Sequence, residues 1–229
     1  MPEPARPRPL DTLRWRGGAP VPWTPGKLVC AGRNYAAHAR ELNNPVPETP
    51  LLFMKPRTAL VDMAAPIALP RGLGACHHEI ELALLIGAEV ADATLPEAAA
   101  AIVGVALALD LTLRDLQGAL KRDGHPWERA KAFDGSCPIS EVLPIAQAGD
   151  PAALEIALAV NGTVRQRGQA AMMLTPPAAL VREIGRAFRL MPGDLVLTGT
   201  PAGVQDLMAG DALRAELVGH FAVETRVQG

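Results

Sequence analysis

The chain has 229 residues, of which 49% are hydrophobic and 20% are charged, so it can bury a sizeable core and is not disordered as a whole. Its 22 lysine and arginine residues against 24 aspartate and glutamate residues give a net charge of −2, and aromatic residues make up only 3%. Nucleic-acid binding is disfavoured, because neither a basic field nor a stacking surface is indicated. The longest apolar runs fall short of the roughly 20 residues that cross a bilayer, so we expect no membrane span.

The N-terminal segment and the cysteines predict where in the cell the protein resides and where its folded domain begins. Proline and arginine dominate the first residues without the apolar stretch of a secretory signal, so we expect a cytoplasmic protein. Residues 1–26 are rich in proline, arginine and glycine, with Trp15 and Trp23 as large anchors, which predicts an extended arm laid against a folded domain of residues 27–229. The three cysteines are odd in number and far apart, which is typical of reduced thiols used for packing.

Short apolar runs alternate with turn residues in the first half of the chain. They predict strands at 27–30, 51–54, 78–86 and 103–109, the last ending in Asp110. Residues 34–42 are read as a helical stretch that three prolines close. Residues 94–97 match a capping box with proline just inside the helix start, which predicts a helix over 95–102.

The second half is dominated by strands. A strand over 154–160 runs into the turn dipeptide Asn161-Gly162, and its partner is predicted at 163–166. Apolar residues at helical spacing predict a helix over 177–190, and strands follow at 195–197 and 212–218. No repeat and no regular βαβ alternation occurs, so we infer an α+β architecture with mixed strands.

Three acidic residues suggest a metal site. Glu79 and Glu81 flank Ile80 in a strand-like run, and the period of two sends both carboxylates to one face. An isolated pair of this kind is most often a solvent-facing strand edge, but Asp110 ends an apolar strand, where an acid requires a partner. Three carboxylates are typical ligands of Mg²⁺ or Mn²⁺ rather than of Zn²⁺. From spacing alone, a metal site and a solvated edge both stay open.

Neighbouring histidines do not strengthen a case for zinc. His77 and His78 follow Cys76 directly, so the three could be taken for soft-metal ligands. Adjacent strand residues point to opposite faces, and one ion cannot readily bind both histidines. We therefore disfavour a zinc site here.

Three further residues could take part in proton transfer or charge stabilisation. His38 and Glu41 are three residues apart in a helical stretch, so they lie on one face and can form a general base, although a surface ion pair is the more common reason for this spacing. Lys131 stands among small and apolar neighbours. A buried lysine can stabilise an enolate or a carboxylate, and a buried stem with its charge in solvent is the alternative.

Glycine-rich segments exclude several familiar sites. The turn from Gly199 to Gly203 follows a strand, and its backbone N–H groups can approach an anion. No Gly-Lys-Ser/Thr follows, so it is not a P-loop. The segment 72–74 lacks the third glycine of a dinucleotide fold, and no Gly-x-Ser-x-Gly elbow occurs.

Six separated motifs, taken in order, are far more specific than any one of them. They are Gly32-Arg33-Asn34-Tyr35 with His38 and Glu41, Phe53-Met54-Lys55-Pro56, His77-His78-Glu79-Ile80-Glu81-Leu82, Asp110 with Arg114-Asp115, Lys131-Ala132-Phe133-Asp134, and Thr198-Gly199-Thr200-Pro201-Ala202-Gly203-Val204. Over about residues 27–218 the series closely resembles the fumarylacetoacetate hydrolase domain family. Within it, the likeness is to the short single-domain branch with acylpyruvate hydrolase, oxaloacetate decarboxylase and oxaloacetate tautomerase activities.

The resemblance implies a fold, an ion and a set of site residues. It implies a mixed β-roll, usually assembled as a homodimer, in which residues 27–229 are the catalytic domain. It implies Mg²⁺, with Mn²⁺ as the alternative, and a catalytic dyad on a lid that orders when ligand binds. The implied ligands of the ion are Glu79, Glu81 and Asp110; the catalytic residues are His38, Glu41 and Lys131; the substrate-binding residues are Arg33, Arg114, Gln117 and Thr200.

One segment departs from the family pattern. After Gly168 the family usually carries threonine or serine and then an acidic or polar residue before methionine, whereas this chain has Gln169-Ala170-Ala171-Met172. The acidic triad is untouched, so the chemistry should survive. A hydroxyl contact or turn cap that relatives make there is put in doubt, and substrate preference can shift.

The resemblance supports a leading hypothesis and two alternatives. The leading one is a Mg²⁺-dependent enzyme for small enolisable 2-oxo acids, acting through a metal-bound enolate in oxaloacetate tautomerisation or decarboxylation, or in acylpyruvate hydrolysis. The first alternative is a step of aromatic catabolism, such as fumarylpyruvate hydrolysis or isomerisation of 2-hydroxyhepta-2,4-diene-1,7-dioate. The second is a catalytically silent, metal-binding dimeric regulator, against which the retention of His38, Glu41 and Lys131 counts.

Overall fold

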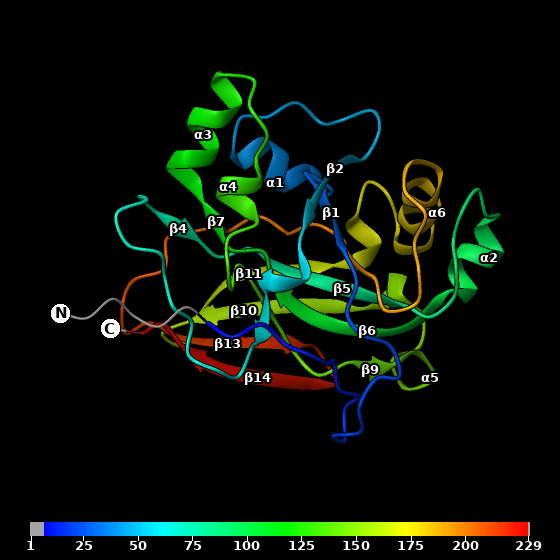
Figure 1. Ribbon diagram of the computed structural model, residues 1–229. Helices are drawn as coiled ribbons and strands as arrows, with labels where there is room; N and C mark the ends of the chain where they lie inside the picture. Colours follow the sequence, from blue (N-terminus) through cyan, green and yellow to red (C-terminus); the bar gives the residue numbers. More distant parts are fainter. Residues whose placement is uncertain (1–6, 229) are drawn as a thin grey trace.

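The computed structural model describes residues 7–228, in which short strands alternate with short helices (Figure 1). The strands are β1 Leu28–Gly32, β2 Leu51–Lys55, β3 Leu60–Asp62, β4 Cys76–His77, β5 Ile80–Ile86, β6 Ile102–Leu109, β7 Thr112–Leu113, β8 Cys137–Ile139, β9 Leu143–Pro144, β10 Glu155–Val160, β11 Thr163–Gln169, β12 Leu195–Leu197, β13 Ala212–Leu217 and β14 Phe221–Arg226. The helices are α1 Ala36–Glu41, α2 Leu95–Ala100, α3 Arg114–Arg122, α4 Glu128–Lys131, α5 Ile145–Ala148 and α6 Pro177–Ala187, with 3₁₀ turns at Arg57–Ala59, Pro151–Ala153 and Ala170–Met172.

The strands form a mixed central sheet and two smaller antiparallel sheets. The central sheet has the order β2-β1-β12-β5-β6-β8-β3, with β9 paired to β6. Its β1–β12 and β3–β8 pairs are parallel, whereas β1–β2, β12–β5 and β5–β6 are antiparallel. A four-stranded sheet has the order β11-β10-β13-β14, and β4 pairs with β7. This topology confirms the expected α+β class with mixed strands.

Strand β5 is buried on both faces, and all of its residues except Glu81 are apolar. Leu82 and Leu84 pack into a core shared with the four-stranded sheet, whose strands β13 and β14 lie below β5 and β6 in Figure 1. Ala83 and Leu85 pack into a second core on the opposite face. The alternation of side chains along the strand therefore separates the two cores.

Residues 7–26, the described part of the predicted arm, pack against that second core. Trp15 and Trp23 pack against it half-buried, and Trp15 bridges to Val142. A Cβ atom at Gly104 would lie 2.9 Å from Trp15 Cζ3, and one at Gly87 would lie 3.1 Å from Trp23 Cη2. A side chain at Gly104 would displace the ring of Trp15, and one at Gly87 would crowd the ring of Trp23. The boundary between an arm and a domain at residue 26 stays a prediction, and residues 1–6 of the arm lie outside the described residues.

Several predicted elements end elsewhere than expected. The helix predicted over 95–102 ends at Ala100, because Ile102 already begins β6. The helix predicted over 177–190 ends at Ala187, since Phe188 has an extended backbone with φ −141° and ψ 122°. The strand predicted over 163–166 runs on to Gln169. The strand predicted over 78–86 begins at Ile80, and α3, α4, α5 and β14 were not predicted.

Helices gather at two ends of the molecule. In Figure 1, α1, α3 and α4 lie together at the top, while α2 and α6 pack against each other at the right. No helix within residues 7–228 has the length and apolar character needed to cross a membrane. The end with α1, α3 and α4 is also where β5 begins and β6 ends, and these ends carry the acidic residues.

Candidate metal and active site

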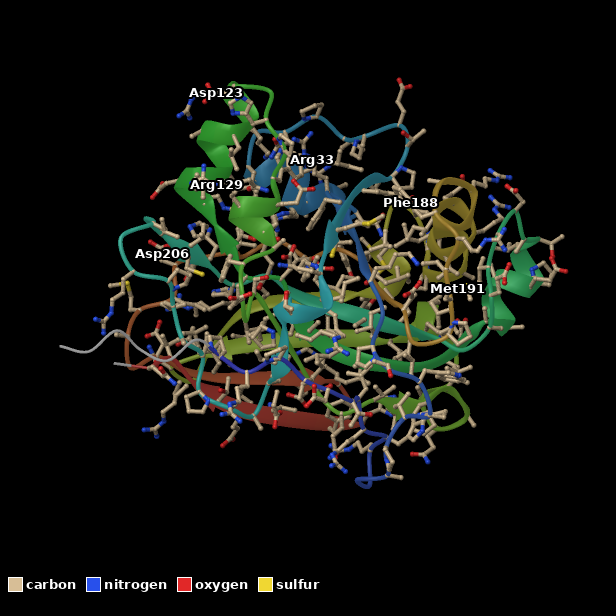
Figure 2. All side chains as sticks on the ribbon, in the orientation of Figure 1. Arg33, Asp123, Arg129, Phe188, Met191 and Asp206 are labelled. Atoms are coloured by element: carbon tan, nitrogen blue, oxygen red, sulfur yellow. The ribbon has the colours of Figure 1, made fainter. Side chains whose placement is uncertain are left out.

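A pocket lies at the end of the central sheet beneath α1, α3 and α4. Nine of the ten site residues implied by the resemblance line it, and Glu41 lies just behind them, bonded to His38. Figure 2 labels Arg33 at the top, beside α1 and close to α3. The residues that line the pocket and were expected at the site are Arg33, His38, Glu79, Glu81, Asp110, Arg114, Gln117, Lys131 and Thr200.

Strand register brings the three acidic residues together. Ile80 pairs with Leu109, and the N–H group of Asp110 donates to the carbonyl of Glu79 at 2.8 Å. Glu79 directly precedes β5 and Glu81 lies within it, two residues apart, so their side chains share one face. Asp110 stands opposite Glu79 on the same face. Carboxylate oxygens of the three lie within 4.8 Å of one another, and all three side chains are buried. The solvated strand edge that spacing left open is thereby ruled out.

Two of the three carboxylates have cationic partners. Lys131 Nζ lies 2.8 Å from Glu79 Oε2 and 2.5 Å from Asp110 Oδ2, and Arg114 also pairs with Glu79. Lys55 Nζ lies 2.8 Å from Asp110 Oδ1. Burial alone would raise the pKa of Glu79, but the charges of Lys131 and Arg114 outweigh it and hold that pKa well below its usual range.

Glu81 has no such cation. Its Oε2 accepts a hydrogen bond from the N–H group of Gly199 at 2.7 Å, and it forms no ion pair within the described chain. Burial, followed by repulsion from Asp110 and Glu79, raises the pKa of Glu81 well above its ordinary value. A hard divalent cation among the three oxygens relieves this repulsion, and an all-carboxylate donor set suits Mg²⁺ or Mn²⁺. The residues present therefore fit such an ion.

Lys131 is fully engaged with protein oxygens. Its ammonium has three N–H donors, and a third bond goes to Thr112 Oγ1 at 2.6 Å, beside the two to Glu79 and Asp110. The side chain is buried, so the alternative with its charge in solvent is ruled out. Any contact of Lys131 with a substrate would exchange one of these bonds.

His38 and Glu41 form the pair that their spacing suggests. His38 Nδ1 lies 3.3 Å from Glu41 Oε2, and Glu41 Oε1 accepts from the N–H group of Gly203 at 2.9 Å. The second bond ties α1 to the glycine-rich turn. Burial lowers the pKa of His38 despite the opposing charges of Glu79 and Glu41, so its imidazole is neutral at neutral pH. A neutral, oriented imidazole is what a general base requires.

The four residues expected to bind substrate differ in their freedom to do so. Arg33 has a left-handed backbone with φ 58° and forms no ion pair within residues 7–228, so its guanidinium is free for an anion. Arg114 donates to Gln117 Oε1 at 2.8 Å as well as to Glu79. Thr200 Oγ1 donates to the carbonyl of Ile80 at 2.7 Å, so its hydroxyl proton is already committed.

Sequence reasoning assigned no role to three polar residues around the site. Lys55 donates to the carbonyls of Lys131 and Ser136 besides pairing with Asp110. Lys121 lines the pocket, with Nζ 5.1 Å from the centre of the Trp127 ring. Gln166 is completely buried on a strand that otherwise reads as exposed. Only Lys55 left a signal, since like Asp110 it is a charged residue at the end of an apolar run.

The segment that departs from the family pattern forms a 3₁₀ turn outside the pocket. Ala170 is buried, whereas Met172 is 68% exposed, and no side chain caps the turn. Gln169 donates to Glu155 Oε2 at 3.2 Å on the strand beside it. None of the four residues lines the pocket, so the departure lies outside the pocket wall.

Comparison with known proteins gives consistent similarities along the chain. The model of the fumarylacetoacetate (FAA) hydrolase C-terminal family matches residues 27–228. Oxaloacetate tautomerase YcgM of Escherichia coli is 48% identical over 214 residues, covering 93% of this chain and 97% of that protein. The mitochondrial oxaloacetate tautomerase FAHD1 of Homo sapiens is 39% identical over 209 residues, covering 90% and 94% respectively.

Solved structures show the same similarity in three dimensions. Fumarylpyruvate hydrolase from Pseudomonas aeruginosa, solved with Mn²⁺ and pyruvate, matches at a TM-score of 0.90 and 38% identity, covering all of this chain and 97% of that one. A family protein from Yersinia pestis matches at a TM-score of 0.92 and 46% identity, covering 94% and 99%. The similarity therefore extends over nearly the whole of each relative.

Proposed function

The chain belongs to the fumarylacetoacetate hydrolase family, and we propose that it is a Mg²⁺-dependent enzyme whose main reaction is the keto–enol tautomerisation of oxaloacetate. The observation that carries the proposal is the buried triad with one uncompensated carboxylate, Glu81, beside a neutral His38 held by Glu41. The tautomerases among its relatives favour this reaction over the other outcomes of an enolate.

A divalent ion bound by Glu79, Glu81 and Asp110 would polarise the 2-oxo group and lower the energy of the enolate. The chain's own residues then have to move one proton. His38 Nδ1 faces Glu41, so in the oriented imidazole Nδ1 carries the hydrogen and Nε2 is the free base. We assign to Nε2 the removal of the proton from C3 of the keto form, and its return to the oxygen at C2 completes the tautomerisation.

The charge of the pocket suits an anionic substrate. Arg33 and Lys121 both line it and form no ion pair in residues 7–228. Two unpaired cations beyond the acidic triad would bind the second carboxylate of a dicarboxylic 2-oxo acid. Oxaloacetate carries such a carboxylate, whereas a simple acylpyruvate does not.

A second candidate reaction is the hydrolysis of fumarylpyruvate. It is favoured by the match to the Pseudomonas aeruginosa enzyme over the full length of this chain. That substrate is also a dicarboxylate, and the same base would activate a water molecule instead of taking the C3 proton. Oxaloacetate decarboxylation and acylpyruvate hydrolysis are further outcomes of the same enolate.

The deciding experiment is a substrate panel with the purified full chain and Mg²⁺. Loss of enol absorbance, release of CO₂ and formation of pyruvate are followed separately, each against Mg²⁺ without protein. We expect oxaloacetate enol loss to be the fastest protein-dependent signal, and His38→Ala to remove it. Enol loss no faster than with Mg²⁺ alone would contradict the proposed main reaction, and rapid cleavage of fumarylpyruvate would establish the second candidate.

We further propose a cytoplasmic homodimer with a catalytic domain that begins near residue 27. The family membership supports the dimer, and the family match beginning at residue 27 is consistent with the domain boundary. Light scattering of the purified chain measures the first, and limited proteolysis near residue 26 tests the second.

A further inference from the structure

Gln166 occupies an unusual position on strand β11. It is the one fully buried side chain of this strand, whose other residues are half-buried or exposed. The strand lies at the edge of the four-stranded sheet and pairs with β10, with Gln166 opposite Leu158. The ladder with β10 uses backbone groups only, so the amide side chain is free to bind elsewhere.

Every hydrogen-bonding group of that amide is used. Gln166 Oε1 accepts from the N–H group of Ile80 at 3.1 Å and from His78 Nδ1 at 2.9 Å. Its Nε2 donates to Thr200 Oγ1 at 2.8 Å and to the carbonyl of Pro201 at 2.7 Å. An amide offers two donors and an oxygen with two lone pairs, so the side chain is saturated. All four partners belong to two segments of the candidate site.

These bonds hold the peptide between two of the acidic residues. Ile80 lies between Glu79 and Glu81, and its N–H group is bound directly by Gln166. Its carbonyl accepts the hydroxyl of Thr200, which Gln166 in turn orients. Both polar backbone groups of Ile80 therefore depend on one amide from another sheet.

The same amide steadies the turn that holds Glu81. Gln166 Nε2 binds Thr200 and Pro201, and the neighbouring Gly199 donates its N–H group to Glu81 Oε2 at 2.7 Å. A shift of the turn would therefore move the donor that fixes the Glu81 carboxylate. Gln166 is thus connected to Glu81 through both the strand and the turn.

We propose that Gln166 is a positioning residue for the divalent cation, which sets the spacing of Glu79 and Glu81 without touching the ion. The inference rests on the proposed metal site. Loss of a residue that holds metal ligands in place commonly weakens binding of the metal ion by about 10–100-fold, because the ligands must be kept in a narrow range of geometry. Gln166 does this through the backbone that joins two ligands.

The test measures metal affinity rather than turnover. Mn²⁺ binding to the full chain is followed by the electron paramagnetic resonance signal of free Mn²⁺, without substrate. Gln166→Met keeps the length of the side chain but removes its polar groups, and we expect Mn²⁺ to bind about 10–100-fold more weakly. The matched control is Gln169→Met on the same strand, an exposed glutamine outside the pocket, for which we expect no change.

A second pair of variants keeps the test decisive if Gln166→Met does not fold. Thr200→Val removes the hydroxyl that connects Gln166 to the carbonyl of Ile80, and Thr200→Ser keeps it. We expect Thr200→Val to weaken Mn²⁺ binding and Thr200→Ser to restore it. Equal Mn²⁺ affinity of Thr200→Val and Thr200→Ser would overturn the inference.

Failure of this inference differs from failure of the proposed function. If the unmodified chain binds Mn²⁺ and Gln166→Met binds it equally well despite a lower melting temperature, the glutamine is merely structural and the inference is wrong. If the unmodified chain binds no Mn²⁺, the metal site itself is wrong, and the inference falls with it.

Discussion

Replacing Glu81 by glutamine should change stability in opposite directions with and without metal. The amide keeps an oxygen that can accept from the N–H group of Gly199, so the geometry of the turn is preserved. It removes a buried charge that lies beside Asp110 and Glu79 without a cationic partner. Glu81→Gln should therefore stabilise the metal-free protein and abolish most of its stabilisation by Mg²⁺ or Mn²⁺.

The higher stability expected of metal-free Glu81→Gln follows from the raised pKa of Glu81 in the parent. Because that pKa is higher in the folded than in the unfolded chain, folding is favoured below the ordinary value of 4.5 and stability is lost as the pH rises through the folded value. Each tenfold difference in proton affinity corresponds to about 1.4 kcal/mol. A gain of about 1 kcal/mol raises the melting temperature of a chain this long by about 2–4 °C. The variant should also lose less stability than the parent on going from acidic to neutral pH.

The loss of stabilisation by metal in Glu81→Gln follows from the binding equilibrium of the ion. At an ion concentration about 100 times the dissociation constant, binding stabilises the parent by about 2.7 kcal/mol, or about 5–11 °C. A loss of about 100-fold in affinity leaves about 0.4 kcal/mol, or about 1–2 °C. Thermal unfolding at neutral pH, with chelator and with excess Mg²⁺, gives both values. A full Mg²⁺-induced rise in Glu81→Gln, or a lower melting temperature in chelator, would refute this reasoning.

Three further predictions concern the pocket. His38→Ala and Glu41→Gln should each lower kcat, and the double variant should lose little more than the worse single one, because the two side chains act as a unit; additive losses in steady-state kinetics would show independent roles. Lys121→Met should raise KM for dicarboxylic substrates about tenfold and leave KM for acylpyruvates nearly unchanged. Burial, followed by the charges of Arg33 and Arg114, lowers the pKa of Lys121 to about 8, so the affinity of the parent for dicarboxylates should fall as the pH rises through that value. A KM for dicarboxylates that does not change with pH would contradict this role of Lys121. Oxalate, which resembles an enolised pyruvoyl group, should inhibit competitively and bind in calorimetry only when Mg²⁺ or Mn²⁺ is present, whereas equal affinity without metal would place it elsewhere.

The grouping of the acidic residues could be predicted because it depends on local regularities. The period of two of extended chain at the start of β5 places Glu79 and Glu81 on one face, and an apolar run that stops just before Asp110 is visible in the sequence. Antiparallel pairing of neighbouring strands then brings the three together. The helical spacing of His38 and Glu41 is local in the same sense.

The supporting polar residues could not be predicted, because their partners are distant in the sequence. Gln166 lies in a run of polar residues that is typical of a solvent-exposed strand. The hydrogen bonds of its side-chain amide form only when two sheets pack together. Lys55 meets Asp110 across more than fifty positions of chain. Helix α3 was not predicted, although Leu116, Ala119 and Leu120 have helical spacing, because the helix has only nine residues. Such contacts are consequences of tertiary packing, for which composition and periodicity carry no signal.

The distribution of tryptophan gives the protein built-in optical reporters. The chain has three tryptophans. Two of them, Trp15 and Trp23, contact glycines where the predicted arm packs against the second core. The third, Trp127, lines the pocket beside Lys121. With Trp15 and Trp23 replaced by phenylalanine, emission would report ligand entry alone, whereas with Trp127 replaced it would report release of the arm. Arm docking and pocket occupancy can thus be followed as separate fluorescence signals without any attached dye.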